Sequence, residues 1–177
     1  MAEAFVIMQI GNPELDAVYR EVIVPAVSAS GLTARRVDKH NEGGLLKNEI
    51  VSFIERAQII VADLTNERPN CYLEVGYAMG LGKFRNLILT ARHDHQPDGP
   101  HHVPSGPKVH FDLGGYDVLY WDPSDLNRFR QDLEIRIRRR LAIVGPGDAL
   151  SPTWDDAWVA DLRRRAMAGL SKHAVAE

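Results

Sequence analysis

The stretch QIIVADLT, residues 58–65, holds four consecutive apolar residues, Ile59 to Ala62, followed by an aspartate. A short apolar run that is rich in β-branched residues and closed by a turn residue is typical of a strand buried on both faces of a parallel sheet. A strand with one solvated face would alternate apolar and polar residues instead. The segment therefore predicts a central strand over 58–62 that leads directly into Asp63.

The segments on either side alternate between strand-like and helix-like patterns. Further strands are expected at 5–10, 32–37, 86–90 and 116–121, and helices at 15–31, 45–57, 70–82 and 125–141. This alternation is typical of βαβ units. We predict an α/β fold: a three-layer, doubly wound parallel sheet of about five strands with a flavodoxin-like strand order. Ligands of such sheets bind at the carboxyl ends of the strands.

Length and composition indicate a folded domain, with 177 residues, 45% of them hydrophobic and 25% charged. A net charge of −3 gives no general attraction to nucleic acid or to an anionic membrane, so we expect neither partner. Without a membrane-length apolar run or a signal-like start, the chain is expected to be cytoplasmic. The single cysteine, Cys71, excludes an internal disulfide and is expected as a small core residue rather than a nucleophile.

The last part of the chain has a different pattern. We expect residues 1–144 to form the α/β domain and residues 145–177 to form a linker and a C-terminal amphipathic helix. The apolar stripe of that helix consists of Trp154, Trp158, Leu162, Ala166 and Leu170. Such a stripe packs either on its own domain or against another subunit. We favour a homodimer or higher homo-oligomer, because twofold assembly is the commonest form.

Polar residues follow the first three predicted strands, in the turns that hold Gly11, Asn12 and Glu14, then Asp38, His40 and Glu42, then Asp63. These turns are expected to converge on one crevice. Asp63 suits a site or a turn cap equally well, and Asp38 with His40 also suits a solvated turn. No Gly-x-Gly-x-x-Gly and no Gly-Lys-Ser/Thr motif is present, so a Rossmann dinucleotide site and a phosphate-binding loop are disfavoured.

The segment NCYLEVGYAMGLGK, residues 70–83, carries one charge, Glu74, between Cys71 and Gly82. We expect this helix to be enclosed on most sides or to line a pocket. With Asn70 as N-cap, Glu74 would lie where amide dipoles favour a carboxylate, whereas burial would raise its pKa. Gly76 and Gly80 each cost about 1 kcal/mol in a helix, which suggests close packing or room for a ligand. The alternative is a structural Glu74 that is paired with an arginine.

The elements IIVADLT (59–65), PNCYLEVGYA (69–78) and Gly82-Lys83 together resemble the nucleoside 2-deoxyribosyltransferase superfamily and the related TIR-like nucleotide glycosidases. The resemblance extends over about residues 4–142. It implies that Glu74 attacks the anomeric carbon of a nucleoside and that Asp63 orients or protonates the base. It also implies a C-terminal segment that completes a neighbouring subunit's site.

The expected function is cleavage or transfer at the N-glycosidic bond of a nucleoside, nucleotide or NAD-like substrate, without a cofactor. An ionised carboxylate stabilises the oxocarbenium-like transition state of that reaction. The family's acidic residue shortly before the nucleophile is replaced here by the neighbourhood of Glu67 and Arg68, and Arg68 suits a phosphate. Expected substrate-binding residues are Gly11, Asn12, Asp38, His40, Arg68 and Asn70. The alternative is a non-catalytic, TIR-like nucleotide-sensing module, which the resemblance associates with antiphage defence.

The segment from Ala91 to Pro107 has no periodicity and is expected to be a long loop. It gathers several metal-binding residue types: His93, Asp94, His95, His101 and His102. Without cysteines or helical spacing, this pattern favours a flexible polar loop over a metal site. We therefore expect no metal, and a lid over the crevice that excludes water.

Overall fold

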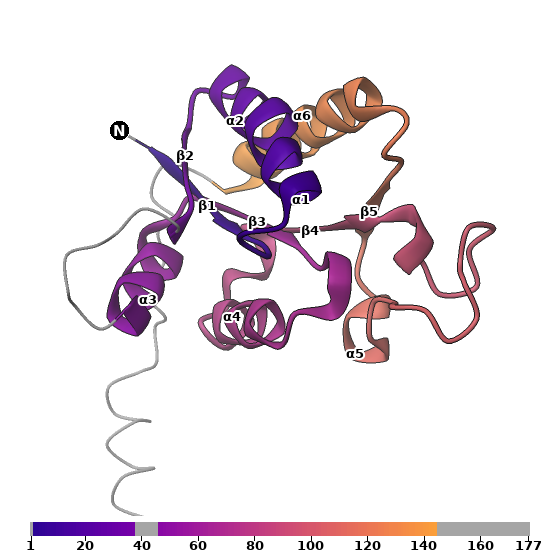
Figure 1. Ribbon diagram of the computed structural model, residues 1–177. Helices are drawn as coiled ribbons and strands as arrows, with labels where there is room; N and C mark the ends of the chain where they lie inside the picture. Colours follow the sequence, from indigo (N-terminus) through magenta and orange to yellow (C-terminus); the bar gives the residue numbers. More distant parts are fainter. Residues whose placement is uncertain (1, 38–45, 145–177) are drawn as a thin grey trace, which may run out of the picture.

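The computed structural model describes residues 2–37 and 46–144 and contains a five-stranded, fully parallel sheet (Figure 1). The strands are β1 (Glu3–Ile7), β2 (Thr33–Arg35), β3 (Ile59–Asp63), β4 (Leu87–Arg92) and β5 (Val118–Trp121). Their order is β2-β1-β3-β4-β5, which is the flavodoxin-like order. The predicted doubly wound sheet with a central third strand is confirmed.

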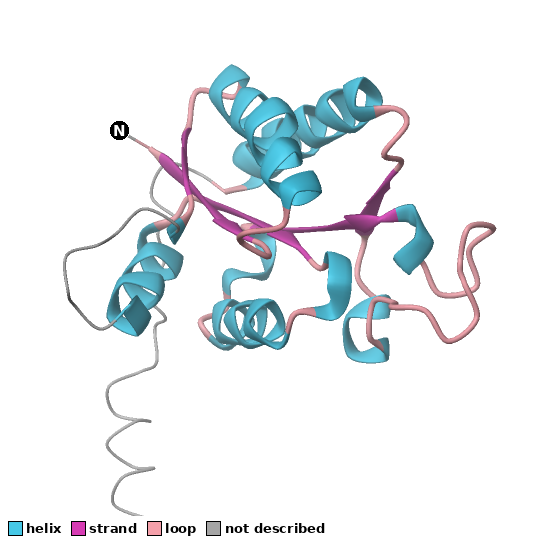
Figure 2. Ribbon diagram, viewed as in Figure 1, coloured by secondary structure: helices cyan, strands magenta, loops and turns pink. Residues whose placement is uncertain are grey.

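Helices cover both faces of the sheet (Figure 2). One face carries α1 (Pro13–Val18), α2 (Val24–Ala29) and α6 (Leu126–Ile143). The other carries α3 (Leu46–Arg56), α4 (Pro69–Gly80) and the short α5 (Phe111–Gly114). The molecule thus has the three layers that the alternation of patterns predicted.

The strand β3 shows why the sheet holds two separate apolar cores. All five of its residues are buried, and successive side chains point to opposite faces. Ile59 and Val61 pack with the layer of α1, α2 and α6, whereas Ile60 and Ala62 pack with the layer of α3, α4 and α5. A strand with one polar face could not fill this position.

The predicted helix at 15–31 is one continuous helical segment with a wider turn in its middle. A π-helical turn, Tyr19–Ile23, joins α1 to α2. Pro25 follows it, and a proline has no N–H to donate and crowds the carbonyl four residues earlier. The π-turn accommodates that proline without ending the helix.

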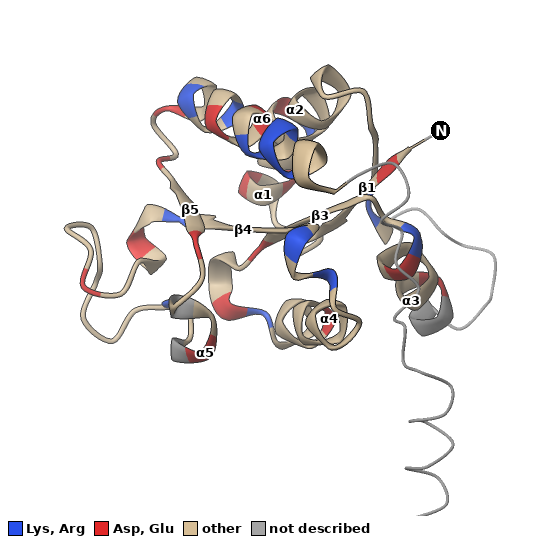
Figure 3. Ribbon diagram, turned by 180° about the vertical axis from the view of Figure 1, so that it is seen from behind, with Lys and Arg blue, Asp and Glu red and all other residues tan. Residues whose placement is uncertain are grey.

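The helix α6 carries several arginines together with acidic residues (Figure 3), and ion pairs neutralise part of their charge. Arg138 pairs with Glu134 at 2.7 Å, and Arg136 pairs with Asp117 at 2.8 Å. Exposed pairs of this kind contribute little to stability.

Two predicted features lie outside the described residues: the turn with Asp38 and His40, and the linker and amphipathic helix of 145–177. The predicted division between 1–144 and 145–177 therefore stays a prediction. Among the helices that the structure describes, none is long and apolar enough to cross a membrane.

Candidate active site

A cavity of about 250 Å³ opens at the carboxyl end of β1, beside the first turns of α4. This is the point between β1 and β3 where the strand order reverses, the usual ligand site of such a sheet. The wall is formed by residues 5–10, by Arg36 and Val37 after β2, by Ile50 of α3, and by Arg68, Asn70, Cys71 and Glu74. The cavity therefore lies at the carboxyl ends of the strands, where ligands of such sheets are expected to bind.

Glu74 is the one carboxylate among the described residues that line this cavity. Within the described part of the chain, no hydrogen bond or ion pair joins it to another residue, so the alternative of a structural arginine pair is not seen there. Burial raises the pKa of Glu74 from its ordinary value near 4.5 to about 7. The site thus holds a carboxyl group that changes charge near neutral pH.

The beginning of α4 differs from the prediction and explains this pKa. The N-cap is Arg68, Pro69 occupies the first helical turn, and Asn70 already lies inside the helix, so the predicted Asn70 cap is wrong. Proline suits the first helical position because that turn needs no N–H donor. Glu74 lies beyond the first turn, where the helix dipole has little effect, and burial dominates its pKa.

Of the two alternatives predicted for α4, a place beside a pocket is found, because Asn70, Cys71 and Glu74 line the cavity, whereas enclosure on most sides is not. Its inward face, with Cys71, Val75 and Ala78, is buried, but Leu73 is 73% exposed. A Cβ added to Gly76 or Gly80 would meet no heavy atom within 4 Å among the described residues, and neither glycine lines the cavity. Close packing against the described residues is therefore not the reason for these glycines, and they do not make room in this cavity.

Asp63 lies in the interior of the sheet and does not line the cavity. Its Oδ1 accepts a hydrogen bond from the Thr65 amide at 3.1 Å. Its Oδ2 accepts from Thr90 Oγ1 at 2.7 Å and from Trp121 Nε1 at 2.9 Å. Asp63 therefore ties the ends of β3, β4 and β5 together, and the structure does not bring it beside Glu74 in one cavity.

The turn after β1 has a structural explanation as well. Gly11 has a φ of 79°, which a glycine adopts without strain, and Asn12 Oδ1 accepts from the Leu15 amide at 3.1 Å and caps α1. Glu14 pairs with Arg92 at 2.7 Å. Gly11 and Asn12 do not line the cavity. Glu14 and Asp63 thus have partners elsewhere and do not line the cavity, although the turns after β1 and β3 do meet, because Asn66 Nδ2 donates to Gln9 Oε1.

Arg68 and Asn70, in contrast, line the cavity, and their contact with a substrate stays a prediction. Arg68 is exposed at the mouth, and its side chain makes no hydrogen bond or ion pair within the described residues. Glu67, next to it, faces away: its Oε1 accepts from the Lys108 amide at 3.0 Å. Among the described residues, the site near Glu74 therefore offers an unpaired cation rather than a second carboxylate.

Sequence reasoning missed two polar residues of the wall, Gln9 and Arg36. Arg36 is nearly buried, pairs with Asp16 at 2.8 Å and lies 4.1 Å from the centre of the Tyr19 ring. Both residues lie just after strands, at the ends that face ligands. That position was the available signal, but it does not say which side chains turn inward.

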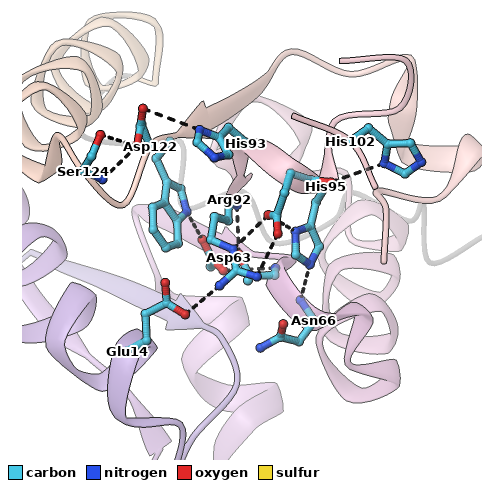
Figure 4. A network of polar contacts seen from close by, with 12 residues as sticks. Glu14, Asp63, Asn66, Arg92, His93, His95, His102, Asp122 and Ser124 are labelled. Carbon is cyan, nitrogen blue, oxygen red and sulfur yellow. Dashed lines mark hydrogen bonds and ion pairs between the residues drawn. The ribbon is translucent and has the colours of Figure 1, made fainter. Parts of the chain in front are cut away.

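The histidine-containing loop is not a lid among the described residues, because none of its residues lines the cavity. His95 is fully buried, and Asp94 links it to Arg92 at the end of β4 (Figure 4). These contacts attach the start of the loop to the sheet, so the prediction of a flexible loop over the crevice is wrong there. The described residues contain no group of three or more His, Cys, Asp or Glu side chains placed to hold a metal ion.

Two motif residues have clear structural roles. Cys71 belongs to the core, and burial, with Glu74 and Asp63 adding to it, raises the pKa of its thiol to about 12. The thiol is therefore protonated at neutral pH and is not a nucleophile. Lys83 is buried, and its Nζ donates to the carbonyl oxygens of Glu55 and Ala57 at the end of α3.

Comparisons with known proteins agree with this fold. No protein-family model matched the chain, and no curated protein matched it. Among solved structures, the chain is similar to a 2-desoxiribosyltransferase from Leishmania mexicana, with a TM-score of 0.50 and 17% identity over 74% of this chain and 98% of that chain. The chain therefore has the α/β fold of the deoxyribosyltransferases.

Proposed function

We propose that this protein cleaves or transfers at the N-glycosidic bond of a nucleoside or nucleotide, with Glu74 as the catalytic carboxylate. The observation that carries the proposal is a partly buried carboxyl group without a partner in the described residues, located in the cavity at the switch point of the sheet. The fold shared with a deoxyribosyltransferase supports the same chemistry.

The chemistry follows from the residue type. As the bond between C1′ and the base breaks, its electron pair leaves with the base and positive charge develops on the sugar. An ionised Glu74 would stabilise that charge or bond to C1′ as a glycosyl-enzyme. Water or a second base would then take the sugar, which distinguishes hydrolysis from transfer. Burial strengthens the interaction of the carboxylate with the developing charge.

The charges around the cavity favour a substrate with a phosphate. Arg68 is an exposed guanidinium without a partner in the described residues, at the mouth of the cavity that holds Glu74. Planar guanidinium groups bind phosphate oxygens in a bidentate manner. We therefore favour a nucleotide or an NAD-like substrate over a free nucleoside. Arg68 would bind its phosphate, and Asn70 would make a further contact.

The remaining predicted residues enter the proposal in lesser roles. Asp38 and His40 follow Val37, which lines the cavity, and are proposed as substrate contacts. Gly11 and Asn12 are proposed to shape the turn that follows the cavity wall. Asp63 is proposed to position the strand ends rather than to protonate the base, because its side chain is fully enclosed and accepts hydrogen bonds from three donors.

A second candidate is a TIR-like module that binds a nucleotide without turnover. It is favoured by one observation: among the described residues of the cavity wall, Glu74 has no second carboxyl group beside it to protonate a leaving base. Such a module would need the cavity and Arg68 but not the charge of Glu74.

The test is to incubate the purified full chain with NAD and with a panel of nucleosides and nucleotides, and to measure released base by chromatography. Wild-type protein is compared with Glu74→Gln, and calorimetry measures the binding of the same compounds. Base release by wild type but not by Glu74→Gln supports the proposed enzyme. Addition of a second free base as acceptor distinguishes transfer from hydrolysis. Binding of equal strength to both proteins without base release would overturn the enzyme in favour of the binding module.

A further inference from the structure

His95 has a defined protonation state because of its two neighbours (Figure 4). Its side chain is fully buried, and its Nε2 lies 2.8 Å from the backbone nitrogen of Asn66. A backbone N–H only donates, so Nε2 must accept and carries no proton. The proton of the neutral imidazole is then on Nδ1, which donates to Asp94 Oδ1 at 2.6 Å.

The residue that His95 holds is in an unfavourable backbone conformation. Asn66 has a φ of 68°, and Glu67, next in the chain, has a φ of 49°. Two consecutive non-glycine residues in the left-handed region are strained, and such a turn persists only where surrounding contacts enforce it. The hydrogen bond from the Asn66 amide to His95 is a contact of that kind.

This turn is connected to both sides of the cavity. The Asn66 side chain donates through Nδ2 to Gln9 Oε1 at 2.9 Å, and Gln9 is part of the cavity wall after β1. On the other side, the chain continues from Glu67 directly into Arg68 and Asn70 at the mouth. A displacement of Asn66 would therefore move Gln9 and Arg68 together.

His95 itself is firmly oriented. Arg92 binds both oxygens of Asp94, with Nε and Nη2 each at 2.9 Å, and its Nη1 reaches Glu14 at 2.7 Å. Burial of Asp94 works against its ionisation, but the hydrogen bonds from Arg92 and His95 outweigh it and lower the pKa of Asp94 to about 2. The carboxylate that accepts the hydrogen bond from His95 Nδ1 is thus charged and fixed in place.

We propose that His95 is a positioning residue for the cavity: its neutral, Nδ1-protonated ring holds the Asn66 turn and thereby orients Gln9 and Arg68 toward the ligand. The nature of the ligand, a nucleotide, rests on the proposed function. The hydrogen bonds that connect His95 through Asn66 to Gln9 do not depend on the proposed function, because all three residues belong to the protein itself.

The variants separate the hydrogen bond from the volume of the ring. His95→Leu fills the space but removes the acceptor, whereas His95→Gln places an amide oxygen near the position of Nε2. His93→Leu is the matched control, since His93 lies in the same short turn, stacks on His101 and is not among the hydrogen-bond partners found for Asn66 in the described residues.

The first measurement needs no substrate. Nitrogen NMR of the wild-type histidines is expected to show His95 protonated on Nδ1 alone at neutral pH. Hydrogen exchange of the Asn66 amide is expected to accelerate at least tenfold in His95→Leu and to stay within about threefold of wild type in His95→Gln and His93→Leu. A proton on Nε2 in the wild type, or unchanged exchange in a folded His95→Leu, overturns the proposal. If His95→Leu does not fold, accelerated exchange in His95→Gln, which leaves the acceptor in place, overturns it.

The second measurement follows base release. His95→Leu is expected to raise KM about tenfold with kcat within about threefold of wild type, and His95→Gln is expected to restore KM. An equal KM in His95→Leu and wild type overturns the role at the cavity. If wild type binds nucleotide without releasing base, the proposed reaction fails, and Kd for the nucleotide takes the place of KM. If wild type binds no nucleotide, the proposed function fails, and the NMR and exchange results decide whether His95 holds the turn.

Discussion

Glu74 shows how a residue's chemistry and its cost to stability arise from the same environment. The cavity wall removes water from its carboxyl group, which raises the pKa to about 7. A carboxylate kept from water and partners interacts strongly with a cation that develops beside it. The same desolvation makes the charged form unfavourable in the folded protein.

Replacing Glu74 with Gln is expected to abolish base release while leaving the fold intact. The amide has the size of the carboxyl group but cannot stabilise or bond to the sugar cation. Circular dichroism and chromatography of released base test this, with Glu67→Gln as a control because Glu67 faces away from the cavity. Full activity in folded Glu74→Gln would refute the mechanism.

Stability should depend on pH in a direction set by Glu74. Its pKa in the folded state, about 7, lies above the ordinary value near 4.5, so between these values the folded state binds more protons than the unfolded state. The contribution of Glu74 to stability is therefore present below about pH 4.5 and is lost as pH rises toward 7. Thermal unfolding at pH 5 and pH 8 tests this: the melting temperature of Glu74→Gln, relative to that of wild type, should be higher at pH 8 than at pH 5. An equal difference in melting temperature at both pH values would contradict a raised pKa of Glu74.

The same ionisation sets the expected pH profile of the reaction. Because the charged carboxylate is the reactive form, kcat/KM should rise with pH through about 7 and then level off. Steady-state rates of base release from pH 5 to pH 9 test this. A profile that falls across that interval would mean that the protonated form of Glu74 is required.

Asp63→Asn should destabilise the protein by about 1–3 kcal/mol, because an amide NH₂ would face a donor where a carboxylate oxygen now accepts. Urea unfolding tests this against Asp122→Asn, an exposed aspartate after β5. Loss of turnover should be the same for good and poor leaving bases. A loss confined to poor leaving bases would show that Asp63 protonates the base after all.

The helix α4 divides its two sides between the interior and solvent. One side supplies Cys71, Val75 and Ala78 to the core, and Glu74 faces the cavity. The opposite side carries Leu73 and two glycines without charge. An uncharged exposed face is uncommon for a helix, and a Cβ added at either glycine of this face would meet no described atom within 4 Å.

Gly76→Ala and Gly80→Ala should therefore each stabilise the protein by about 0.5–1 kcal/mol. Neither glycine has a positive φ, and an added Cβ meets no described atom within 4 Å. Denaturant unfolding measures the change, and Gly82→Ala is the control expected to destabilise because Gly82 has a φ of 74°. Destabilisation by Gly76→Ala would show that this face is covered in solution.

For the whole molecule, the prediction that remains is assembly through the C-terminal segment. Truncation after Val144 should yield a monomer with impaired activity, because the apolar stripe of 145–177 would be lost. Light scattering of the full chain and of the truncated chain measures the oligomeric state, and base release measures activity. A full-length chain that is already monomeric at micromolar concentration would place the stripe on its own domain.

The layers and the strand order could be predicted because they depend on patterns local in sequence. Continuous apolar residues from Ile59 to Ala62 suit only a doubly covered strand, and the helical spacing around it leaves few ways to cover both faces. Glu74 could be selected for a similar reason, since a lone charge in an apolar helix needs an environment that accepts it.

The partners of individual polar groups could not be read from the chain. Asp63 and Glu74 both looked like site carboxylates, but Thr90 and Trp121, far along the sequence, enclose the first, while the second faces a cavity. His95 looked like part of a mobile loop and is buried against Asn66. Hydrogen bonds between distant residues depend on how strands and loops meet in space, and a sequence pattern carries no information on which side chains will then be within 3 Å of each other.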